Sequence, residues 1–300
     1  MLTVQLKQQG GQAMDFLFDS LVDWIKEALI GGITQNYQGM FDELNVRVGE
    51  IASQVGQTPE GWNSGVFSMI RSLSDTVIIP IAGMILTAVL CYELIQMVIS
   101  HNNMQNFETF VFFKWIFKTF AAVYILTNTF NIVMAVFDVA QHVVNSSAGF
   151  ISGSLDVTLA MDSLDTELQA MEWYALLGLY LESAILSLCM KALSACVFII
   201  VIGRMLEIYL TVSVAAIPFS TMVNRDWGQI GNNYLKGLFA LAFQGFFMMV
   251  IIGIYAVLLN STVFDGNIHA SIWKAVGYTI LLCFSLFKSS ALSKSLFGSH

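Results

Sequence analysis

The chain has 300 residues, of which 56% are apolar and 11% are charged, and its net charge is −8. An acidic balance of this kind argues against a basic surface for nucleic acids. The apolar residues come in long blocks instead of recurring at the spacing of an amphipathic soluble helix, so we expect a polytopic membrane protein.

Residues 1–75 carry nine acidic and four basic side chains and contain no run that could cross a bilayer. Between residues 15 and 29 the apolar positions recur at helical spacing, and acidic side chains follow every fourth residue along another flank. This pattern predicts an amphipathic helix that lies on a membrane surface, on a partner or on its own chain. The apolar positions between residues 41 and 55 indicate a second helix. We expect this N-terminal region to be extracytoplasmic.

Residues 76–288 are expected to form a bundle of transmembrane helices. Five apolar blocks lie at residues 76–100, 109–140, 173–219, 235–264 and 268–287. Within the fourth, residues 237–264 include no charged side chain. A helix of that length reaches ~42 Å, more than the ~30 Å hydrocarbon core of a bilayer. The sequence therefore predicts an all-α fold with about five membrane spans.

The third block is long enough for one extended helix or for two passes with a turn near Arg204. Short cytoplasmic loops collect Lys and Arg, whereas exported loops do not. The link 139–172 has neither, while residues 220–236 carry both types. An odd number of passes must join the two links, and three do not fit. We therefore expect one pass, an external N-terminus and a cytoplasmic tail at 289–300, although Arg71 counts against this orientation.

Ionisable groups within the spans are costly and are candidates for a pore or for subunit contacts. They are Glu93, Glu182, Lys191, Arg204 and Glu207. Arg204 and Glu207 are one turn apart and can pair along the helix. Glu182 and Lys191 point to opposite faces of one helix, so each requires a partner from another helix, another subunit or a watery cavity. The alternative for Lys191 is that its side chain extends to the membrane interface.

Motifs for catalysis are missing from the sequence. The four histidines are isolated, and there is no H-E-x-x-H, no G-x-S-x-G and no glycine-rich loop that would cradle phosphate. We therefore expect neither enzyme activity nor a metal or other cofactor.

Residues 215–246 contain a proline after a long apolar helix, then a threonine, a tryptophan, a polar turn and another long helix. This stretch resembles the TrbL-like, VirB-class polytopic inner-membrane subunit of conjugative type IV secretion systems, in the form found in Gram-positive mobile elements. Pro218, Thr221 and Trp227 match the positions that this family shows. The resemblance implies a non-enzymatic channel or scaffold subunit for DNA transfer in the cell (inner or plasma) membrane.

The resemblance also implies a ring-forming homo-oligomer that contacts other secretion-system subunits, the conjugation ATPase and membrane lipids. The turn with Trp227 is the expected docking site, with simple interfacial anchoring as the alternative. The acidic outer segments give no support for a path of single-stranded DNA. The competing function is a secondary transporter or ion channel with Glu93, Glu182 and Lys191 as coupling groups, although the chain shows no internal repeat.

Overall fold

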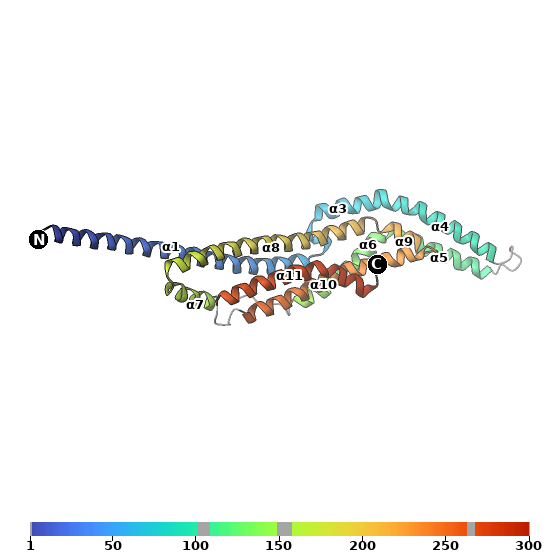
Figure 1. Ribbon diagram of the computed structural model, residues 1–300. Coiled ribbons are helices and arrows are strands. Elements are labelled where there is room, and N and C mark those ends of the chain that lie inside the picture. Colours follow the sequence, from blue (N-terminus) through green and yellow to red (C-terminus); the bar gives the residue numbers. More distant parts are fainter. Residues whose placement is uncertain (1, 101–108, 149–157, 263–267, 300) are drawn as a thin grey trace. The chain divides into compact units, whose positions relative to one another are not determined.

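The computed structural model describes residues 2–100, 109–148, 158–262 and 268–299 (Figure 1). Within these ranges every regular element is a helix and there is no strand, which confirms the predicted all-α class. The helices are α1 Leu2–Val55, α2 Pro59–Trp62, α3 Ser64–Leu73, α4 Ile79–Ser100, α5 Thr109–Thr127, α6 Thr129–Ala148, α7 Thr158–Gln169, α8 Trp173–Ser213, α9 Ala216–Thr221, α10 Gly228–Thr262 and α11 Ile268–Phe297, with a π-helical segment at Ser74–Ile78.

Five helical stretches of the described chain are long and apolar enough to cross a membrane, in agreement with the prediction of about five. They are Ser64–Ile99, Phe110–Thr127, Trp173–Ser213, Gly228–Leu259 and Trp273–Phe297. Residues 173–213 of the third apolar block form a single unbroken helix, α8, with no turn near Arg204. The second block is divided at Asn128, and of its two helices only α5 qualifies as a span.

Residues 2–55 form one helix, α1, where the sequence indicated two helical segments. This helix has 54 residues, or ~81 Å at 1.5 Å per residue. Gly31 and Gly32 lie within it, and a helix accommodates each at ~1 kcal/mol relative to alanine. A Cβ atom at Gly32 would lie 2.6 Å from Cε2 of Tyr180 on α8, so the missing side chain permits the close approach of these two helices.

The described chain divides into two compact units. The first comprises residues 1–49, 153–197 and 254–283, and the second comprises residues 50–152, 198–253 and 284–300. In the first unit, Asn36 Nδ2 of α1 donates to Ser183 Oγ of α8 at 3.0 Å. Ser194 Oγ donates to a carboxylate oxygen of Glu43, so polar side chains join the same two helices at a second point.

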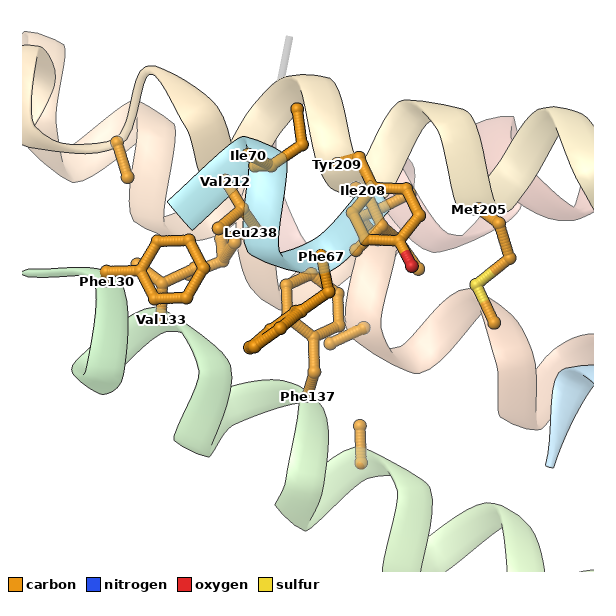
Figure 2. Packing of buried hydrophobic residues seen from close by; sticks show 14 of the residues in the cluster. Phe67, Ile70, Phe130, Val133, Phe137, Met205, Ile208, Tyr209, Val212 and Leu238 are labelled. Carbon is orange, nitrogen blue, oxygen red and sulfur yellow. The ribbon is translucent and has the colours of Figure 1, made fainter. Parts of the chain in front are cut away.

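The core of the second unit lies where α3, α6, α8 and α10 contribute buried apolar side chains. Figure 2 shows Phe67 of α3 directed toward Phe130 and Phe137 of α6, with Tyr209 of α8 close by. The rings of Phe67 and Phe130 meet edge to face, with centroids 5.5 Å apart. The Tyr209 hydroxyl donates to the Pro59 carbonyl at 2.6 Å, which satisfies its polar end inside the core.

A smaller core of the second unit packs the short helix α9 against α4 and α5. Its buried members include Leu86, Leu126 and Ala216. The sequence placed Pro218 at the end of the long apolar helix, but α8 ends earlier, at Ser213, and Pro218 lies in the first turn of α9. Proline is tolerated there because the amide groups of the first turn have no partner within the helix.

Candidate functional site

Glu93 of α4 forms the centre of a polar cluster that joins three elements of the second unit. Lys118 Nζ of α5 donates to Glu93 Oε1, and Asn224 Nδ2 donates to Glu93 Oε2 at 2.9 Å. Asn224 follows α9 and is 1% exposed. Each carboxylate oxygen therefore holds a separate element against α4, and the lysine neutralises the carboxylate charge.

The segment between α9 and α10 is shaped by Asn224. Its side-chain oxygen accepts from the backbone amides of Asp226 at 2.8 Å and Trp227 at 3.3 Å. An asparagine that bonds its own following backbone in this way fixes a turn. The same side chain therefore shapes the turn with one end and binds Glu93 with the other.

Two further contacts hold this turn to α4. The rings of Tyr92 and Trp227 are stacked, with centroids 5.3 Å apart and an interplanar angle of 5°. Gln96 Nε2 lies 3.2 Å from Asp226 Oδ2 and 2.9 Å from the Tyr92 hydroxyl. We name Tyr92, Glu93, Gln96, Lys118, Asn224, Asp226 and Trp227 the Glu93 cluster.

Arg204 of α8 is the most deeply buried cation among the described residues, at 6% exposure. A Cβ atom at Gly245 of α10 would lie 2.7 Å from Arg204 Nη2, so the glycine makes space for the guanidinium. Arg204 Nε has no hydrogen-bond partner among the described residues. The spacing allows an Arg204–Glu207 pair, but the Glu207 carboxylate binds Lys294 of α11 at 3.3 Å, because that ammonium reaches the same exposed side of α8.

Glu182 and Lys191 do not meet, as their spacing on α8 predicts. Glu182 Oε1 accepts from Trp273 Nε1 of α11 at 2.7 Å, so its contact comes from another helix of the same chain. Lys191 is exposed. Burial raises the pKa of Tyr37 on α1 to about 12, and the charge of Glu182 adds to the rise, so Tyr37 remains protonated at neutral pH.

The three residues of the predicted docking turn differ in accessibility. Pro218 and Thr221 are buried, and Thr221 Oγ1 donates to the Pro218 carbonyl at 2.8 Å. Trp227 is 43% exposed. Only the tryptophan therefore presents a substantial surface to a partner, while the other two shape α9.

Sequence reasoning identified Glu93 and Trp227 but did not bring them together. In the sequence Lys118 is one basic residue among several. Asn224 carries no signal there, because its role depends on a turn whose form the sequence does not reveal. Within the described ranges there is no group of three His, Cys, Asp or Glu side chains that could hold a metal ion. The polar groups of the Glu93 cluster are engaged with each other.

The family model for the TrbL/VirB6 plasmid conjugal transfer like protein matches residues 44–216, more than half of the chain. The chain belongs to this TrbL/VirB6-like family. No curated protein and no solved structure matches it. The family match includes Glu93, Lys118 and Arg204, but it ends before Pro218, so the stretch on which the sequence resemblance was argued lies almost wholly outside it.

The Glu93→Gln variant should loosen the turn between α9 and α10. The neutral amide has one acceptor oxygen, so either Lys118 or Asn224 loses its partner, and a hydrogen bond to a charged group contributes about 1.5–3 kcal/mol. Arg225 in this turn is exposed, and trypsin cleaves after it. We expect trypsin to cleave the detergent-solubilised variant roughly tenfold faster or more than the wild type. Mass spectrometry measures this cleavage.

The matched control is Asp75→Asn, which removes the carboxylate that pairs with Arg71. The side chains of Asp75 and Arg71 are each 50% exposed. Exposed pairs contribute little, so this variant should be cleaved after Arg225 at the wild-type rate. Equal rates for wild type and Glu93→Gln would show that Glu93 does not hold the turn.

Proposed function

We propose that the chain is a non-enzymatic channel or scaffold subunit of a conjugative secretion apparatus. The family match carries this proposal, because it identifies the chain as a conjugal-transfer membrane subunit. The five apolar helices agree with a multi-pass location in the cell membrane. The Glu93 cluster supports a scaffold role, since its charged and polar groups form contacts within the chain.

The spans differ in how much of their surface the chain itself covers. In the most apolar window of Gly228–Leu259, 50% of the residues are buried, compared with 17% for Ser64–Ile99 and 6% for Phe110–Thr127. Lipids or neighbouring subunits must cover the remainder. We propose a ring-forming homo-oligomer in which α4 and α5 supply the uncovered faces.

No specific observation favours the competing function of a secondary transporter. Both carboxylate oxygens of Glu93 are occupied, and Glu182 is bound by Trp273. A coupling group must exchange its partner for an ion or a proton during transport. Groups that are already held by neighbouring helices suit a fixed bundle better.

Deletion of the gene from a conjugative element that carries it should abolish transfer, and the gene supplied in trans should restore it. In detergent, the purified protein should have the mass of an oligomer of several copies. Full transfer by the element that lacks the gene would refute the assignment. A monomer that rescues transfer would refute the ring alone.

The proposed orientation places the N-terminus outside and the C-terminal tail in the cytoplasm. After the native cysteines are replaced by alanine, a membrane-impermeant maleimide should label Asp165→Cys in intact cells. It should label Arg225→Cys only after lysis. Both positions are exposed, so access and not burial decides the result. The reverse pattern would invert the topology.

We further propose that Trp227 docks another subunit or the conjugation ATPase. Trp227→Ala should lower recovery of that partner with the tagged chain by tenfold or more, the scale of a central aromatic contact. Tyr92→Ala removes the same ring stack but keeps the exposed indole, so it should retain most of the partner. Trp173→Ala, at another exposed tryptophan, should have no effect. Equal losses for Trp227→Ala and Tyr92→Ala would assign Trp227 to turn stability only.

A further inference from the structure

An apolar groove of about 730 Å³ follows one face of α5 in the second unit. Helices α6, α9 and α10 supply its other walls, and their lining side chains include Ile132, Phe219 and Phe239. A site of this volume is large enough for a drug-sized or lipid-sized apolar ligand. None of the residues that line the groove is acidic.

The length of the groove along α5 matches half of a membrane. Its lining residues on this helix extend from Lys114 to Ile125. Eleven residues of helix rise ~16 Å, and half of a ~30 Å hydrocarbon core is ~15 Å. Lys114 lies one turn inside Phe110, where the span begins, and Ile125 lies two residues before Thr127, where it ends, so the groove continues past the middle of this span.

Two cations line the part of this groove that is nearer to Phe110. Lys114 and Lys118 are four residues apart and lie on the same face of α5. Lys118 is neutralised by Glu93. Lys114 is exposed and forms no ion pair with any residue that the structure describes. An ammonium group at the membrane boundary favours an anion at headgroup level.

We propose that the groove binds an anionic phospholipid, with an acyl chain along α5 and the phosphate on Lys114. The charge at one end, the apolar walls and the length of half a bilayer together fit this ligand. A partner helix would fill the walls but would not require the unpaired cation at that end. The inference is independent of any role in DNA transfer, because it concerns the purified chain and its membrane.

Native mass spectrometry of the full chain in detergent tests the site with phosphatidylglycerol and phosphatidylcholine as probes. Wild type should bind phosphatidylglycerol about fivefold more tightly, the equivalent of ~1 kcal/mol for one lysine near the headgroups. Lys114→Gln should remove this preference and leave phosphatidylcholine binding unchanged. Ala121→Trp, which fills the groove, should weaken the binding of both lipids.

Two matched controls isolate the groove. Lys288→Gln removes an exposed lysine on α11, and Val123→Trp adds the same ring to a part of α5 that does not line the groove. Both should bind like wild type. Equal affinity of wild type for the two lipids, or an equal loss in Lys288→Gln, would overturn the proposal. Occupation of the groove by a second protein in place of lipid would also overturn it. If Ala121→Trp does not fold, the Lys114→Gln comparison still decides.

Discussion

The pairing of Glu93 is the constraint on which the arrangement around α9 depends. A carboxylate within a membrane span is costly unless its charge is neutralised and its oxygens are hydrogen-bonded. Lys118 and Asn224 meet both requirements, and they come from elements 25 and 131 residues away along the chain. The three elements must therefore assemble together, because each one alone would leave a polar group unpartnered in an apolar environment.

Polar contacts have this importance because apolar surface gives little specificity inside a membrane. Lipid tails are as apolar as leucine, so helices recognise each other through close packing of small residues and through hydrogen bonds. Both devices occur in the two units. Gly32 admits the ring of Tyr180, and Gly245 admits the guanidinium of Arg204. Asn36 with Ser183, and Gln244 with Ser289 at 3.2 Å, add hydrogen bonds between helices.

The sequence was sufficient for the spans because continuous apolar length is a local property. Block 173–219 was recognised as one long apolar block despite its ionisable groups, and α8 accounts for most of it. The break at Asn128 was missed because apolar side chains continue on both sides of it, and hydropathy does not register a helix interruption. The continuity of α1 was missed for a related reason. Residues 29–41 contain no proline, so the sequence does not show whether one helix continues there or two helices meet.

The candidate site was only half visible because its partners are fixed by tertiary structure. Glu93 could be identified from its cost in a membrane, whereas Asn224 is one amide among several polar residues of a turn. Arg204 and Glu207 show the limit of an argument from spacing alone. Their spacing satisfied the rule for a pair on one helix, but Gly245 offers the guanidinium a buried position and Lys294 offers the carboxylate an exposed partner. Helical spacing brings two charges within reach of each other, but the neighbouring helices decide whether they pair.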